Sequence, residues 1–103
     1  MATRVAVARI PDVPPGATRI VEALGHTIAL CNVDGQFYAI DDRCSHEDAS
    51  LGEGTLLGHL LECPRHGARF DVRTGQPVTL PAVIPVARYL VKIEGDQVFV
   101  EVP

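Results

Sequence analysis

Hydrophobic and polar residues alternate in short segments along most of the chain, and no segment shows the 3.6-residue period of an amphipathic helix. In the first ten residues, alternation around Val5 and Val7 stops at the stretch 11–16, which contains three prolines and a glycine. Because a period of two directs one face of a strand toward a core, these segments favour β-strands. The predicted strands are Thr3–Ile10, Thr18–Leu24, Thr27–Val33, Phe37–Ile40, Val86–Ile93 and Gln97–Val102.

Turn-forming residues lie between several of these strands. Asp34-Gly35 separates two of them, and a two-residue type I′ turn needs positive φ at both central positions, which these residue types tolerate. The Glu-Gly-Asp segment 94–96 lies in the same way between the last two strands. The chain is therefore expected to form antiparallel hairpins at both ends.

The middle of the chain is less regular and is rich in Gly, Pro, His and Cys. It contains a smaller predicted hairpin, Thr55–Leu57 and His59–Cys63, with its turn at Gly58. Loops held by rigid strands commonly carry the function of all-β proteins. We therefore predict an all-β fold in one domain, 1–103. Its antiparallel β-sandwich scaffold would comprise about 1–41 and 86–103, with an inserted, loop-built site at about 42–85.

The charge distribution excludes several classes of partner. The net charge is −4, and the nine Lys and Arg residues are scattered rather than clustered, which disfavours nucleic acid and anionic membranes as partners. No run approaches the roughly 20 apolar residues of a membrane span. The first 16 residues do not resemble a signal peptide, so we expect a cytoplasmic location.

Two short motifs carry the candidate chemistry. Cys44-Ser45-His46 is followed, after sixteen residues, by Cys63-Pro64-Arg65-His66. Thiolates favour zinc, copper(I) and iron–sulfur clusters, and imidazole is compatible with zinc and iron. Zinc sites often group like ligands together, whereas each pair here is mixed, so a structural zinc site is the less favoured alternative.

The double motif, C-x-H and then C-x-x-H, resembles the signature of Rieske [2Fe-2S] proteins. The stretch 63–71 is similar to the family's second cluster loop, and Gly75 with 77–85 is similar to its proline-rich covering loop. The resemblance implies a Rieske-type sandwich with an inserted cluster-binding subdomain, built on two ligand loops and this covering loop. It also implies one [2Fe-2S] cluster, with Cys44 and Cys63 on one iron and His46 and His66 on the other.

Two neutral imidazoles in place of thiolates make the centre less negative, so its reduction potential lies above that of all-cysteine sites. High-potential relatives add a disulfide between the loops, and Ser and Tyr hydroxyls that donate to sulfur. The matching positions here are Ala49 and Arg65 for the disulfide, and Ala68 and Phe70 for the hydroxyls. With fewer donors to stabilise the reduced state, we predict a potential at the low end of the Rieske range.

The resemblance implies a soluble, monomeric one-electron carrier that passes electrons from a flavin-dependent ferredoxin reductase to a terminal oxygenase. It is not expected to be an enzyme, because the 37 residues after His66 contain no further His for a mononuclear iron site. The alternatives are a small subunit of an assimilatory nitrite reductase and, in another class, a zinc-binding structural module.

Other polar residues and the remaining cysteine have simpler expected roles. Cys31 is predicted to be a buried, inert thiol, His59 a surface residue, and His26 a turn residue without a partner. The acidic residues near the first motif are predicted to be solvated, with part of a docking face as the alternative: Asp41, Asp42, Glu47 and Asp48.

Overall fold

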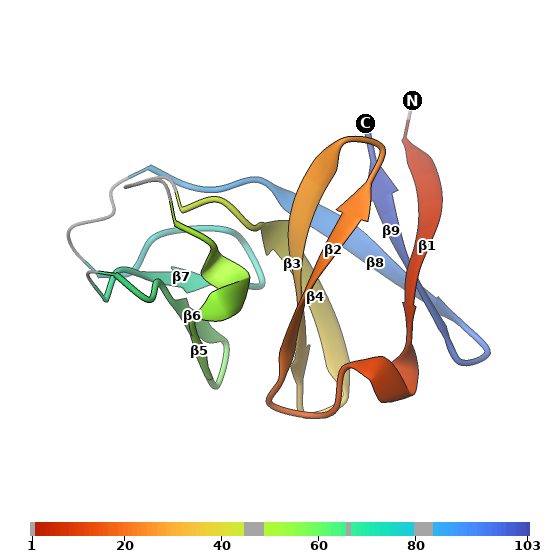
Figure 1. Cartoon of the computed structure of the whole chain (residues 1–103), viewed down its shortest axis with the longest axis horizontal. Helices are drawn as coiled ribbons and strands as arrows, with labels where there is room; N and C mark the ends of the chain where they lie inside the picture. The colour runs from red at the N-terminus through yellow and green to blue at the C-terminus, as the bar shows by residue number, and fades with distance from the viewer. Residues whose placement is uncertain (1, 45–48, 66, 80–83) are drawn as a thin grey trace.

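The computed structural model describes residues 2–44, 49–65, 67–79 and 84–103. Within them the chain forms antiparallel strands and two single turns of 3₁₀-helix, and no helix is long and apolar enough to cross a membrane. The strands, labelled in Figure 1, are β1 (Thr3–Arg9), β2 (Thr18–Ala23), β3 (His26–Val33), β4 (Gln36–Asp41), β5 (Thr55–Leu57), β6 (Leu60–Glu62), β7 (Arg69–Asp71), β8 (Arg88–Glu94) and β9 (Gln97–Val102). The 3₁₀ turns are η1 (Ile10–Asp12) and η2 (Leu51–Glu53).

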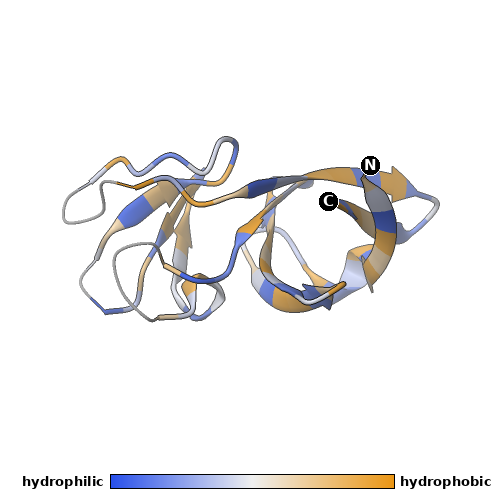
Figure 2. Cartoon of the chain, turned by 90° about the horizontal axis from the view of Figure 1, so that it is seen from above, coloured by the Kyte–Doolittle hydropathy of each residue, from blue (hydrophilic) through white to orange (hydrophobic). Residues whose placement is uncertain are grey.

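The strands form a large sheet and a small one. The large sheet has the order β1-β9-β8-β4-β3-β2, and the small sheet has the order β5-β6-β7. Figure 2 shows the large sheet curled around on itself, with the small sheet beside it. Its two halves, β1-β9-β8 and β4-β3-β2, are joined where Ala39 pairs with Tyr89 and Ile40 with Arg88. The all-β, antiparallel prediction is confirmed, and the expected sandwich takes the form of one curled sheet whose halves face each other.

Two hydrophobic cores divide the interior, and β3 contributes to both. Ile28 and Leu30 pack into the core enclosed by the large sheet, while Ala29, Cys31 and Val33 pack into the core shared with the small sheet. Since side chains alternate along a strand, the two sets point to opposite faces of β3. Burying an aliphatic side chain of this size contributes about 1.5–3 kcal/mol, so both cores depend on this strand.

The β3–β4 hairpin follows the prediction. Asp34 and Gly35 have φ values of 52° and 92°, the positive pair that a type I′ turn requires. The β2–β3 turn uses the same geometry at Leu24 and Gly25, with φ values of 49° and 84°. Leu is rarely a turn former, so the sequence predicts Leu24 as the end of the preceding strand.

Two other boundaries differ from the predictions. The strand β7 lies in a stretch that was expected to be loop, and it pairs with β6 through Leu61 and Phe70. The last hairpin begins at Arg88 rather than Val86, because the Val86 N–H donates to the Gly75 carbonyl at 2.9 Å and ties that residue to the small-sheet region. A Cβ on Gly75 would lie 2.1 Å from the Val86 oxygen, so only glycine allows this approach.

Candidate metal centre

The two predicted thiolate ligands come from different sheets and meet in one core. Cys44 lies three residues after β4, and Cys63 directly follows β6. Their exposed fractions are 2% and 1%, and both belong to the core shared by the two sheets. The predicted histidine ligands, His46 and His66, lie outside the described residues. The structure therefore brings together half of the predicted ligand set.

Each cysteine stands at the neck of a loop of the same span. The Cys44 N–H donates to the Ala49 carbonyl at 2.9 Å, and the Cys63 N–H donates to the Ala68 carbonyl at 2.7 Å. Both hydrogen bonds join residue i to residue i+5, so each loop is closed directly behind its cysteine. This arrangement fits a small inorganic group held between two matched loops, with a soft sulfur donor supplied by each.

The first loop is also tied together by Asp42, which corrects the prediction that this residue is solvated. Asp42 is 6% exposed, and its carboxylate accepts hydrogen bonds from Ser50 Oγ at 2.6 Å and from the Gly52 N–H at 2.7 Å. Its backbone carbonyl accepts a third from the Leu51 N–H. A buried carboxylate is costly unless it is hydrogen-bonded, and these donors satisfy it. Asp42 therefore fastens the start of the loop to η2 beyond its end.

Asp41 and His26 also have partners, so their predictions are corrected as well. The Tyr89 hydroxyl donates to Asp41 Oδ1 at 2.8 Å, and the Tyr89 hydroxyl oxygen lies 3.3 Å from His26 Nδ1. Burial, assisted by the nearby Asp41 carboxylate, raises the pKa of Tyr89 to about 12. These contacts fix the end of β4 just before the first loop. The other two acidic residues of that prediction, Glu47 and Asp48, lie outside the described residues.

The second loop ends in an apolar setting. Ala68 and Phe70 are fully buried, and both share a core with Cys63. Neither side chain carries a hydroxyl, as the prediction of a low potential requires. The adjacent strands are joined by an ion pair between Arg69 Nε and Glu62 Oε2 at 2.8 Å.

The start of the predicted covering loop lies along β7. Val78 donates its N–H to the Arg69 carbonyl at 2.8 Å, and Phe70 forms an isolated bridge with Pro77. Residues 80–83 of this loop lie outside the described residues.

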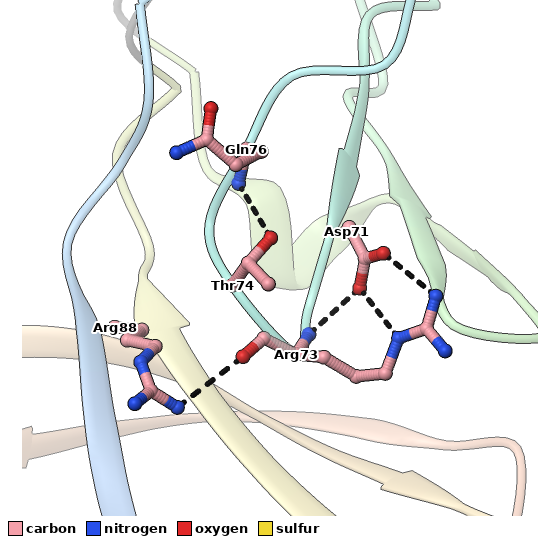
Figure 3. A network of polar contacts seen from close by, with 5 residues as sticks. All are labelled: Asp71, Arg73, Thr74, Gln76 and Arg88. Atoms are coloured by element: carbon pink, nitrogen blue, oxygen red, sulfur yellow. Dashed lines mark hydrogen bonds and ion pairs between the residues drawn. The ribbon is translucent and has the colours of Figure 1, made fainter.

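A polar network that was not predicted joins the small sheet to β8 (Figure 3). The Asp71 carboxylate accepts hydrogen bonds from the Arg73 guanidinium and, as a smaller effect, from the Arg73 backbone N–H, and these lower the pKa of Asp71 below its usual range. Arg88 Nη1 in turn donates to the Arg73 carbonyl at 3.3 Å. The Asp-x-Arg spacing of this turn is a sequence signal from which the Asp71–Arg73 contact could have been predicted. The contact between Arg73 and Arg88 joins residues fifteen apart and leaves no such signal in the sequence.

The two remaining predictions concern Cys31 and His59. Cys31 is fully buried, which confirms the predicted burial, and burial raises the pKa of its thiol to about 12, in the direction expected of an inert thiol. His59 is half-buried rather than on the surface, with its ring edge-on to Tyr38 at 5.7 Å between centroids. Within the described part of the chain, no three His, Cys, Asp or Glu side chains gather as a metal site.

Comparison with known proteins agrees with this geometry. The model of the Rieske [2Fe-2S] domain family matches residues 3–90. The 3-phenylpropionate/cinnamic acid dioxygenase ferredoxin subunit of Escherichia coli (strain K12) is 43% identical over 101 residues, which cover 97% of this chain and 94% of that protein.

Two solved structures are also similar. The ferredoxin of carbazole 1,9a-dioxygenase from Nocardioides aromaticivorans IC177 has a TM-score of 0.92 and 37% identity, covering 95% of this chain and 96% of that one. The second is a complex of reduced oxygenase and oxidised ferredoxin in carbazole 1,9a-dioxygenase. The matching chain has a TM-score of 0.89 and 40% identity, covering 94% of this chain and 91% of that one.

The family match covers most of the chain, and the identity extends over nearly its whole length. The two buried thiols at the necks of matched loops are soft donors of the kind that iron–sulfur clusters favour. The chain belongs to the Rieske [2Fe-2S] ferredoxins of bacterial aromatic dioxygenase systems, which are electron carriers rather than catalysts.

Proposed function

We propose that Cys44 and Cys63 bind one iron of the [2Fe-2S] cluster and that His46 and His66 bind the other. The observation that carries this proposal is the placement of Cys44 and Cys63, which are both buried in one core and both stand at the neck of an i to i+5 loop. Cys31 shares that core but lies within the ladder of β3, where no loop opens beside it. The three cysteines therefore differ in backbone setting.

Serine substitutions test this assignment, with Cys31 as the matched control. We expect Cys44→Ser and Cys63→Ser each to lose most of the iron, acid-labile sulfide and visible absorption of the purified protein. Cys31→Ala should keep all three. Full cluster content in either serine variant, or its loss in Cys31→Ala, would contradict the ligand assignment, as would zinc in place of iron.

We further propose that residues 42–85 form the cluster-binding region of a single domain, 1–103. The small sheet and both cysteine loops lie between β4 and β8, and these two strands pair with each other at the base of the insertion. The proline-rich segment 77–85 is proposed to cover the cluster. Its start lies along β7, where the Val78 N–H donates to the Arg69 carbonyl.

When bound, the cluster takes up and releases one electron. The chain's own contribution is the setting of its ligands, because apolar side chains at positions 68 and 70 supply no hydroxyl to the sulfurs. We therefore propose a midpoint potential below 0 mV, within the family's range of roughly −150 to +300 mV. Protein-film voltammetry measures it directly, and a midpoint well above 0 mV would refute the proposed low potential.

We propose that the protein is a cytoplasmic monomer that accepts electrons from a flavin-dependent ferredoxin reductase and passes them to a terminal oxygenase. Two observations support this proposal. The similar Escherichia coli protein is a dioxygenase ferredoxin subunit, and a similar ferredoxin is found in complex with its oxygenase. A reconstituted system should show substrate-dependent NADH oxidation only when all three components are present. Co-purification with a nitrite reductase instead would favour the alternative assignment, and sedimentation analysis tests the monomer.

A further inference from the structure

The Thr79 side chain lies where the covering segment leaves β7. Its hydroxyl oxygen accepts a hydrogen bond from the Arg69 N–H at 2.8 Å. The same hydroxyl points toward the Gly67 carbonyl at 3.5 Å, which is longer than a usual O–H···O hydrogen bond and therefore a weak contact. One half-buried side chain thus contacts the backbone of β7 at Arg69 and the backbone of the second loop at Gly67, the residue after His66.

The neighbouring hydrogen bonds show why this contact is unusual. Asp71 donates its N–H to the Gln76 carbonyl at 2.9 Å, and Val78 donates its own to the Arg69 carbonyl at 2.8 Å, so the segment begins as a strand beside β7. In a regular antiparallel ladder, Arg69 and Val78 would exchange two backbone hydrogen bonds. The Arg69 N–H donates instead to the Thr79 hydroxyl, which replaces a backbone acceptor at the point where pairing ends.

We propose that Thr79 is a positioning residue, whose hydroxyl fixes the backbone of the second cluster loop and the start of the covering segment to each other. This inference rests on the proposed assignment of Cys63 and His66 as ligands. A hydroxyl can accept one hydrogen bond and donate another at the same time, whereas a methyl group in its place can do neither. The β-branched side chain has few χ1 rotamers, so the hydroxyl is held in place at little entropic cost.

Three variants of the full-length, cluster-loaded protein test the proposal. Thr79→Val removes the hydroxyl with little change of shape, and Thr79→Ser keeps the hydroxyl and removes the methyl. Thr55→Val makes the same change on β5, at an exposed position of the same small sheet. The readouts are the rate of iron loss to a chelator and the electron paramagnetic resonance g-values of the reduced protein.

We expect Thr79→Val to lose iron at least fivefold faster than the wild type and to show shifted g-values. Thr79→Ser and Thr55→Val should stay within twofold of the wild-type rate. A Thr79→Val rate within twofold with unchanged g-values would overturn the proposal. So would equal damage in Thr79→Ser, since it would assign the effect to the methyl group.

Backbone amide exchange supplies a readout that does not depend on the cluster. The Arg69 amide should lose at least tenfold of its protection in Thr79→Val and keep it in Thr79→Ser. Unchanged protection in Thr79→Val would overturn the proposal even where that variant loads poorly. Failure of the ligand assignment is separable, because it appears as cluster retention in Cys63→Ser and leaves the Arg69 exchange result intact.

Discussion

The carboxylate of Asp42 offers the most direct test of how the first loop is held. Asp42→Ala removes the acceptor of the hydrogen bonds from Ser50 Oγ and the Gly52 N–H. A hydrogen bond to an ionised group contributes about 1.5–3 kcal/mol, so two give roughly 3–6 kcal/mol. Both donors are half-buried, so water can form part of the hydrogen bonding that the carboxylate provided. We therefore expect the free energy of unfolding to fall by about 2–4 kcal/mol. That is a large fraction of the roughly 5–15 kcal/mol typical of a domain.

Asp42→Asn separates geometry from charge. Its oxygen can still accept from the Gly52 N–H, and its amide nitrogen can donate to Ser50 Oγ, because a hydroxyl serves in either role. We expect a loss of about 1 kcal/mol for this variant. Glu53→Ala is the matched control, since Glu53 is an exposed carboxylate in the same 3₁₀ turn. It should change stability by no more than about 0.5 kcal/mol.

Thermal unfolding of the holoprotein, followed by circular dichroism and visible absorbance at a fixed scan rate, measures these differences. For a domain of this size 1 kcal/mol corresponds to roughly 4–8 °C, so a loss of about 2–4 kcal/mol in Asp42→Ala should lower Tm by about 8–32 °C. A decrease under about 3 °C, below what 1 kcal/mol produces, would refute the reasoning. Equal losses in the Asn and Ala variants would show that charge, rather than the two acceptor positions, holds the loop.

Three further predictions concern pH, potential and a backbone contact. Burial raises the pKa values of Cys31 and Tyr89 to about 12, so the folded state disfavours their ionised forms. The free energy of unfolding should therefore be at its full value below the ordinary thiol pKa and fall from about pH 9 toward 12. Urea titrations from pH 8 to 11 measure this, and a flat profile would contradict it. Phe70→Tyr adds a hydroxyl beside the buried thiols. If its hydrogen bond strengthens by about 1 kcal/mol on reduction, voltammetry should show a rise of about 40 mV, and a lower potential would count against the donor argument. Gly75→Ala forces a Cβ to 2.1 Å from the Val86 carbonyl at a φ of 82°, so chemical denaturation should show a loss of at least about 1–3 kcal/mol, and unchanged stability would count against it.

Alternation along the chain predicted the six strands of the large sheet well, because one-sided or two-sided burial leaves a direct imprint on residue type. The strand β7 escaped detection, since three residues with one buried side chain, Phe70, are too few to show a period. Turn geometry was predictable at Asp34-Gly35, where both residue types favour positive φ. At Leu24 the tertiary structure imposes a conformation that the residue itself disfavours.

The thiolate pair of the candidate site could be predicted from motif spacing, but its supports could not. Asp42 looks like any solvated acid until Ser50 and Gly52, eight and ten residues later, are brought back to it. Thr79 likewise lies ten residues from Arg69, its partner across a strand pair. Such contacts depend on the conformation of the loops, which brings residues distant in sequence together. Residue type alone does not indicate that conformation.

The position of β3 between two cores has a consequence for how this sequence can vary. All six residues from Ile28 to Val33 are buried, so this part of the strand offers no position where introducing a polar side chain is inexpensive. Substitutions at the even-numbered hydrophobic residues, Ile28 and Leu30, disturb the core enclosed by the large sheet. Substitutions at the odd-numbered residues of this segment disturb the core that contains Cys44 and Cys63. A single segment therefore limits mutational drift in both halves, and a homologue can repack one interior only through substitutions that respect the other.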